Sequence, residues 1–378
     1  MGKKESIYER LGVQRLINAA GTYTVIGGSR MSERTLSDIA EASRSFVEIP
    51  KLQQKAHERI ASLTKNEAAY IATGGAASIY ITAGAALARK YQKKVKYLSQ
   101  EDIRSSEAIM FRAHRSPYDW GLLQLGVKVV DVGFPNVIGP ASREDLEAAI
   151  SERTCAIFYA AGGPGGWLAE GSLDLKDTLE IAAKHDIPVI VDAAAQVPPV
   201  DNLWNFTALG ASAVIFSGGK DLRGPQASGL IVGKKDFMRY VSETGFPNYG
   251  IGRMLKVGRE EIVGLTSAIE QYVLLDHAKR RDWAESVVQE LIEGLSSLKK
   301  VSVTRSFPNE AGQPMARAIV SHSELKAEQM IARLMQGDPG IITMKAGEHA
   351  IFINPMTLDE SEVGTVRTRL LAVLGDKE

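Results

Sequence analysis

Lys220 lies in the segment of the sequence with the clearest chemical potential. Its surroundings are the run SGGKD (217–221), between an apolar stretch and a second one at 228–232, so we expect the lysine at a strand end. Flanking glycines let a bulky group approach the backbone. A partly desolvated lysine amine can condense with an aldehyde, because burial disfavours the ammonium form. An isolated Gly-Gly-Lys, however, is more often a surface turn.

Asp192 closes a second apolar run, IPVIV (187–191). An ionised carboxylate at a strand end can face a pyridine nitrogen and keep it protonated, and a protonated ring can take up the electrons of a carbanion. Taken alone, such an aspartate is more often a helix cap or a turn residue.

A third segment, ATGGAAS (72–78), joins an expected strand to an expected helix without a side chain larger than threonine. Free backbone N–H groups and the positive end of a helix bind anions, and small residues allow close contact. The pattern therefore suits a phosphate group, although a tight turn without a ligand explains it equally well.

The three segments come in the order phosphate turn, aspartate and lysine, each at the carboxyl end of an expected parallel strand. Ligands of open α/β sheets bind at that edge. Together they predict a pyridoxal 5′-phosphate (PLP) enzyme whose cofactor is bound covalently to Lys220.

The elements that position these residues alternate between short apolar runs and helical patterns over 67–235, which predicts a mostly parallel sheet of seven strands. The expected strands are 68–72, 95–98, 127–132, 156–160, 188–192, 213–217 and 229–232, with helices over 76–91 and 175–185.

A long helical stretch over 260–298 is expected to link this sheet to a smaller α+β domain. Strands are predicted there at 301–304, 317–320, 341–344 and 350–353, and helices at 326–335 and 361–374. The predicted domains are an N-terminal arm without a sheet pattern (1–60), a large PLP-binding domain (61–255), and the linking helix with the small domain (256–378).

Composition favours a small-molecule enzyme over a nucleic-acid or membrane protein. The chain has 45 basic and 45 acidic side chains, so no net charge attracts it to anionic polymers. Its single cysteine, Cys155, excludes disulfides and cysteine-based metal sites. The first ten residues resemble neither a secretory signal nor a membrane anchor. A cytoplasmic enzyme without a metal ion is therefore expected.

The chain resembles the fold-type I (aspartate aminotransferase-like) PLP enzymes, and within them the branch of bacterial selenocysteine synthase and its shorter lyase-like relatives. The resemblance rests on INAAGT (17–22), AAAQVPP (193–199) and above all SGGKDLRGPQASG (217–229). It covers most of the chain. It implies an α/β fold with a mostly parallel seven-stranded sheet and a smaller C-terminal α+β domain.

The resemblance also implies roles for individual residues. Lys220 would hold the cofactor, Asp192 would meet its ring nitrogen, and His114 would stack on the ring. The phosphate would be surrounded by Thr73, Gly74, Gly75 and Ser217. The chain departs from related enzymes at Ala195, where they often have histidine or glutamine, so the partner of the cofactor O3′ stays open. Gln196, one position later, is a candidate cofactor-binding residue.

The implied reaction is an α,β-elimination. The amine of Lys220 removes the α-proton of a β-hydroxy amino acid or amino sugar acid, the β-hydroxyl leaves, and hydrolysis gives a 2-oxo acid and ammonia. D-Glucosaminate 6-phosphate is the expected type of substrate. Its anionic groups suit arginine, and the candidates are Arg30, Arg115, Arg223 and Arg253.

Two alternatives stay open. A tRNA-dependent selenium transferase is disfavoured by the balanced charge, and because the core pattern begins by Asn18, leaving no room for an N-terminal tRNA-binding domain. A racemase, an aldolase or an aminotransferase would use the same site, and the sequence does not separate them. A homodimer or larger dimer-based oligomer is expected.

Overall fold

The structure is a computed structural model that describes residues 5–161 and 169–375. It contains two compact units. The larger unit comprises Ser29–Leu275 and Ala311–Gln313, and the smaller one comprises Met1–Gly28, Asp276–Glu310 and Pro314–Glu378.

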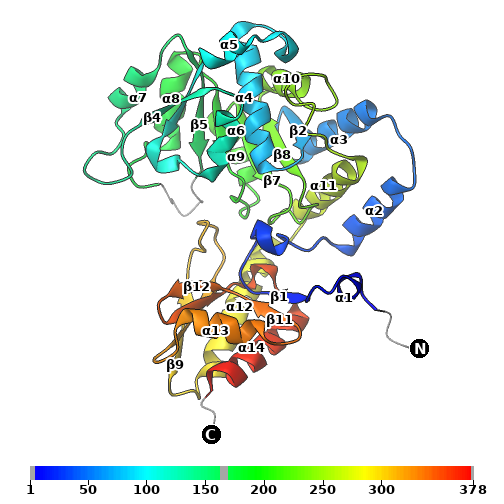
Figure 1. The fold of residues 1–378 in the computed structure, drawn as a ribbon, viewed down its shortest axis with the longest axis vertical. Helices are drawn as coiled ribbons and strands as arrows, with labels where there is room; N and C mark the ends of the chain where they lie inside the picture. Colours follow the sequence, from blue (N-terminus) through cyan, green and yellow to red (C-terminus); the bar gives the residue numbers. More distant parts are fainter. Residues whose placement is uncertain (1–4, 162–168, 376–378) are drawn as a thin grey trace. The chain divides into compact units, whose positions relative to one another are not determined.

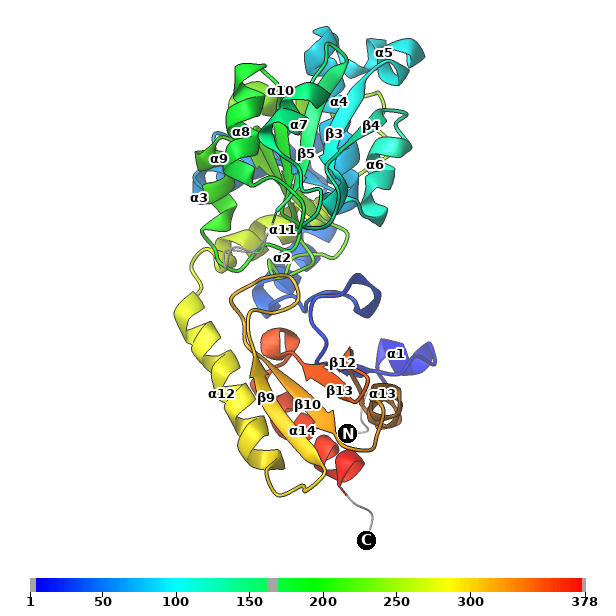
Figure 2. The ribbon, with the colours of Figure 1, turned by 90° about the vertical axis from the view of Figure 1, so that its left-hand side faces the viewer.

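A seven-stranded sheet forms the centre of the larger unit (Figures 1 and 2). Its strands, in spatial order, are β2 (Ala68–Ala72), β8 (Gly229–Gly233), β7 (Ala213–Ser217), β6 (Val189–Asp192), β5 (Thr154–Ala160), β3 (Glu107–Phe111) and β4 (Lys128–Val132). All neighbouring pairs are parallel except those that involve β8, which is antiparallel to both β7 and β2. Consequently β2, β6 and β7 run in the same direction.

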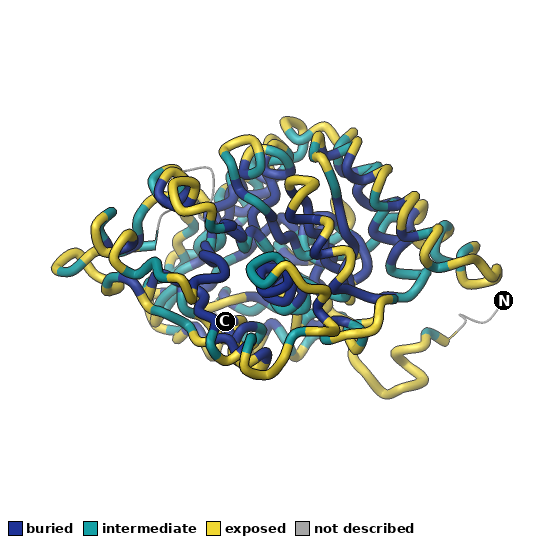
Figure 3. Tube along the Cα trace, turned by 90° about the horizontal axis from the view of Figure 1, so that it is seen from above, coloured by how far each residue is buried: buried dark blue, intermediate teal, exposed yellow. Residues whose placement is uncertain are grey.

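Both faces of this sheet are apolar, as expected for strands that are covered by helices on two sides. Tyr70, Ile190 and Ile215 point to one face, and Ile71, Val191 and Phe216 point to the other. The first face packs against α4 (Gly75–Tyr91), α5 (Gln100–Arg104), α6 (Trp120–Leu123) and α10 (Lys235–Thr244). The second packs against α3 (Ile49–Leu63), α7 (Arg143–Ala149), α8 (Leu175–Lys184), α9 (Asn202–Leu209) and α11 (Arg259–Tyr272). Most residues of these strands except β4 are buried, and the outer turns of the helices are exposed (Figure 3).

The predicted number of strands is confirmed, but one predicted strand is wrong. Residues 95–98 form a 3₁₀ turn, η2 (Val95–Tyr97), in which Val95 is buried while Tyr97 is 65% exposed. The seventh strand is β3, which the sequence did not reveal. It begins at Glu107, a buried carboxylate that accepts hydrogen bonds from Lys128, Ser151 and Arg153. Its apolar run, 108–111, is only four residues long and lies between charged residues, Glu107 and Arg112.

The N-terminal part of the chain contains more regular structure than its sequence suggested. β1 (Leu16–Asn18) pairs in parallel with β11 (Gly340–Ile342), so the expectation that the first 60 residues lack a sheet pattern is wrong. α1 (Ile7–Arg10) precedes β1, and α2 (Glu33–Ser43) packs with α11 in the larger unit. The predicted helical stretch 260–298 is broken into α11 and α12 (His277–Leu295).

The smaller unit contains a four-stranded antiparallel sheet in the order β12 (Met344–Gly347), β13 (Ala350–Ile353), β10 (Arg317–His322) and β9 (Val301–Ser306). Its core is formed with α12, α13 (Ala327–Met335) and α14 (Glu360–Leu374). The predicted strand 341–344 is divided between β11 and β12. Within residues 5–161 and 169–375, no helix is both long and apolar enough to cross a membrane.

Candidate active site

The site is built at one edge of the large sheet, where β2, β6 and β7 end. Ala72 and Ser217 both lie opposite Gly229, on either side of β8, and Asp192 lies beside Ile215 of β7. The phosphate turn, the aspartate and the lysine therefore leave the sheet at the same edge, as predicted from their order in the sequence.

Glycine is required in the phosphate turn. Gly74 has φ +133°, which side-chain-bearing residues rarely adopt, and it is the N-cap residue of the 17-residue helix α4. A Cβ on Gly75 would lie 3.5 Å from Cβ of Ala194 and 3.9 Å from Cβ of Ser217. The N-terminus of α4 thus faces the segments after β6 and β7. Its free N–H groups and positive end suit an anion there.

The lysine segment is held by close backbone contacts. A Cβ on Gly218 would lie 2.1 Å from Oγ of Ser228, and one on Gly219 would lie 2.4 Å from Cα of Gln226. The segment is also tied to α11, because the hydroxyl of Tyr272 donates to the buried carboxylate of Asp221 at 2.8 Å. Lys220 itself is half-buried.

Lys220 and Asp192 interact electrostatically. Burial lowers the pKa of the Lys220 amine, and the negative charge of Asp192 opposes that shift. Burial raises the pKa of Asp192, while the backbone N–H of Ala194, which donates to its Oδ1 at 3.0 Å, and the charge of Lys220 oppose the shift. Each group therefore has its charged form disfavoured by burial and partly restored by the other.

His114 lies at the same edge, on the 3₁₀ turn η3 (Arg112–His114) that follows β3. The backbone N–H of Ala160 donates to its Nδ1 at 3.2 Å, so the proton of the neutral ring is on Nε2. Burial lowers the pKa of His114 to about 4. Nε2 is buried and has no hydrogen-bond partner within the described ranges. Its ring packs edge-on against Tyr159, with centroids 4.5 Å apart.

Gln196 is buried after β6, and its side chain points to another part of the larger unit. Its Nε2 donates to the carbonyl of Ala311 at 3.1 Å, and its Oε1 has no partner among the residues that the structure describes. Its predicted role in binding the cofactor stays a prediction.

The four arginines differ in what surrounds their guanidinium groups. Arg115 binds the carboxylates of Asp119 and Asp131, the latter at 2.7 Å. Arg253 lies over the rings of Phe246 and Tyr249, 5.0 and 5.9 Å from their centroids. Arg30 is exposed, and Arg223 is half-buried with φ +57°. Because both carboxylates already occupy its guanidinium, Arg115 is a poor candidate for binding substrate.

Sequence reasoning missed three residues beside Asp192. Ser116, Asp119 and Tyr159 line a cavity of about 30 Å³ together with His114 and Asp192. Asp119 lies on the 3₁₀ turn η4 (Pro117–Asp119) and is buried. The capping pattern from Ser116 to Asp119 was the only signal in the sequence, and it indicates a turn rather than a site.

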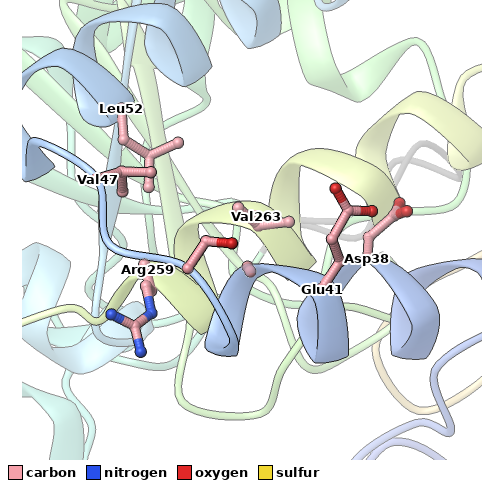
Figure 4. Close-up of a pocket in the computed structure, with 8 residues that line it drawn as sticks. Asp38, Glu41, Val47, Leu52, Arg259 and Val263 are labelled. Atoms are coloured by element: carbon pink, nitrogen blue, oxygen red, sulfur yellow. The ribbon is translucent and has the colours of Figure 1, made fainter.

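Some other cavities in the larger unit are lined by none of the predicted site residues. Figure 4 shows one of about 300 Å³ between α2, α3 and α11, lined by Asp38, Glu41, Val47, Leu52, Arg259 and Val263 among others. The carboxylates of Asp38 and Glu41 lie toward one side and the guanidinium of Arg259 toward the other. The residues that line this cavity include no lysine and none of the phosphate turn.

Comparison with known proteins identifies the relatives of the chain. The family model described as L-seryl-tRNA selenium transferase matches residues 16–293. A D-glucosaminate-6-phosphate ammonia lyase from Salmonella typhimurium is 30% identical over 375 residues, which cover 97% of each chain. A 5′-C-glycyluridine monooxygenase-decarboxylase from Streptomyces sp. is 28% identical over 93% of this chain and 84% of its own length.

A solved structure of D-glucosaminate-6-phosphate ammonia-lyase is also similar. It superimposes with a TM-score of 0.85 at 29% identity and covers 98% of this chain and 99% of its own. The predicted fold class, an α/β transferase-like fold with a mostly parallel sheet and a smaller second sheet, is thereby confirmed.

Proposed function

Because the chain belongs to the L-seryl-tRNA selenium transferase family, we propose that it is a PLP-dependent ammonia-lyase. Its substrate would be a β-hydroxy amino acid or an amino sugar acid such as D-glucosaminate 6-phosphate. The proposal is supported by the 30% identity to an ammonia lyase over almost the whole of both chains. The observation that carries it is the place of Lys220 and Asp192 at one sheet edge, where the charge of each affects the other.

The residues present fit PLP. The turn at Gly74 and Gly75 offers a helix N-terminus to a phosphate, and Asp192 offers a half-buried carboxylate to a ring nitrogen. His114 presents a buried Nε2–H without a partner in the described part of the chain. When bound, the cofactor would supply an electron sink for a substrate carbanion.

Lys220 has the properties of the base in this reaction. Because burial lowers its pKa, a larger share of its amine is neutral near physiological pH than in an exposed lysine. A neutral amine can accept the α-proton of the substrate. Loss of the β-hydroxyl and hydrolysis then give a 3-deoxy-2-oxo acid and ammonia, so the water lost in elimination is regained.

Arg30, Arg223 and Arg253 remain our candidates for the anionic groups of the substrate. Arg253 is half-buried against two aromatic rings, which would restrict its side chain and lower the entropy cost of binding.

A substrate screen tests the proposal. Purified protein with PLP is incubated with β-hydroxy amino acids and amino sugar acids, each with and without a phosphate, and 2-oxo acid and ammonia are measured. We expect both products in equal amounts, with preference for a phosphorylated sugar acid. Ammonia without 2-oxo acid, or no release from any substrate, would contradict the proposal. A mobility shift with tRNA at low salt separates it from a selenium transferase, because we expect no shift.

We further propose a dimer-based assembly in the cytoplasm. Tyr249 and Met254 are 80% and 68% exposed on the segment 249–256, although both carry large apolar surfaces. Light scattering of the purified protein would show a mass of at least two chains, and a monomer would contradict this proposal.

A further inference from the structure

The buried carboxylate of Asp119 lines the same small cavity as Asp192. Asp119 and Asp192 both line this space of about 30 Å³, together with His114 and Ser116. Asp119 is 6% exposed. The negative charge of Asp119 acts on Asp192 and disfavours its ionised form, because little water screens the two groups in so confined a space.

The cation that holds Asp119 is Arg115. Its Oδ2 accepts hydrogen bonds from Nε of Arg115 and from the backbone N–H of Ser116, the latter at 3.1 Å. The far end of the guanidinium of Arg115 binds Asp131 on β4 at 2.7 Å. Arg115 thus lies between a carboxylate that lines the cavity and one that does not.

We propose that Arg115 and Asp119 are positioning residues that set the charge of Asp192, with Arg115 offsetting the negative charge that Asp119 presents to it. This inference deepens the proposed function and rests on it, because Asp192 matters as the partner of the cofactor ring. It also gives Arg115 a role other than binding substrate.

The groups that face Asp192 support this assignment. Burial favours its protonated form and raises its pKa, and the charge of Asp119 acts in the same direction. The backbone N–H of Ala194 and the charge of Lys220 favour its ionised form. His114 also faces the cavity and stays neutral, because its Nδ1 accepts from Ala160. Without Arg115, the full charge of Asp119 would act on Asp192. Asp192 would then hold a proton and attract a cationic ring less well.

A double-mutant cycle on the full chain tests the inference. The dissociation constant of PLP is measured by equilibrium dialysis, at neutral pH and across a pH series, for the wild type, Arg115→Met, Asp119→Asn and the double variant. Asp131→Asn is the matched control, since it removes the other carboxylate from Arg115 without altering the cavity.

We expect Arg115→Met to raise the dissociation constant of PLP by about tenfold or more. A tenfold change corresponds to a rise of about one unit in the pKa of Asp192. Asp119→Asn should bind PLP as tightly as the wild type, and tight binding should extend to lower pH. The double variant should recover to within about threefold of the wild type, and Asp131→Asn should stay within about twofold.

Two results would overturn the inference: a double variant as weak as Arg115→Met, or an Asp119→Asn variant that binds about tenfold more weakly than the wild type. If Arg115→Met does not fold, an Asp119→Asn variant with an unchanged pH series also refutes it. Failure of the wild type to bind PLP would refute the proposed function as well. If the wild type binds PLP tightly but the effects of the two substitutions simply add in the double variant, only this inference is refuted.

Discussion

At the scale of single residues, Lys220 and Asp192 have opposite charges, and burial disfavours the charged form of each. Burial lowers the pKa of Lys220 and raises that of Asp192, and each partly corrects the other. A neutral amine is the form that condenses with an aldehyde, and an ionised carboxylate is the form that holds a protonated ring. A cationic ring placed beside Asp192 would favour that ionised form, so cofactor binding and the charge of Asp192 should be coupled.

Asp192→Asn should remove the negative charge of this side chain while keeping its size and shape. Asparagine keeps an oxygen that can accept from Ala194, so the fold should change little. The lost charge should weaken PLP binding by about tenfold or more and slow elimination by about 100-fold or more. Titration with PLP and steady-state rates check this. A variant with the rate of the wild type would remove the role proposed for Asp192.

The sequence placed Lys220, Asp192 and the phosphate turn at one sheet edge, because each follows an apolar run directly. It did not reveal Asp119 or Tyr159. Asp119 comes from a short turn with no apolar period, and Tyr159 lies inside a buried strand. Their place beside Asp192 depends on the order of β3, β5 and β6 in the sheet, which no local pattern encodes.

At the scale of elements, the phosphate turn depends on a neighbouring strand. A Cβ on Gly229 of β8 would lie 2.6 Å from the backbone carbonyl carbon and oxygen of Gly74. Real Cβ atoms do not approach backbone so closely, so the absence of a side chain at Gly229 lets the turn lie across β8. The site thus needs a glycine in a strand as well as those in the turn.

Gly229→Ala should displace the turn rather than break the sheet. The expected result is a loss of PLP affinity of about tenfold or more, with a loss of stability of about 1–3 kcal/mol. Calorimetry and PLP titration measure the two effects. Gly364→Ala on α14 is the matched control, because its Cβ would meet no atom within 4 Å. An affinity equal to that of the wild type would show that the turn does not depend on this contact.

Most elements could be predicted from periodicity, and the errors have physical causes. Residues 95–98 alternate like a strand, yet they form a single turn in which Val95 is buried and Tyr97 is exposed. Strand β1 was missed because its three residues form a strand only by pairing with β11, which lies more than 300 positions later in the sequence. Short segments of this kind are defined by their partners, not by their own composition.

At the scale of the whole molecule, the half-buried His57 and the buried His114 make the stability of the protein depend on pH. Burial lowers the pKa of His57 and of His114 to about 4. His57 accepts a hydrogen bond from the backbone N–H of Ile71 at 3.0 Å, which links α3 to the edge strand β2. Both histidines must be neutral to accept these backbone hydrogen bonds, so protonation favours unfolding.

The sign of the effect follows from these pKa values. In the unfolded chain histidine titrates near pH 6.5, so between about pH 6.5 and 4 the unfolded state binds more protons. Stability should therefore be full above pH 6.5 and fall by up to about 1.4 kcal/mol per pH unit for each histidine as the pH decreases. Urea midpoints of the cofactor-free protein measure this. His57→Gln keeps an acceptor for Ile71 and should reduce the slope, and a midpoint that is constant over this range would contradict the prediction.

The central claim is that Lys220 carries the cofactor, and chemical trapping tests it most directly. The protein is saturated with PLP, reduced with borohydride and digested, and the labelled peptide is identified by mass spectrometry. We predict a single label on Lys220 and none in a Lys220→Ala variant treated in the same way. A label on another lysine, or no label on a protein that is saturated with PLP, would contradict the account.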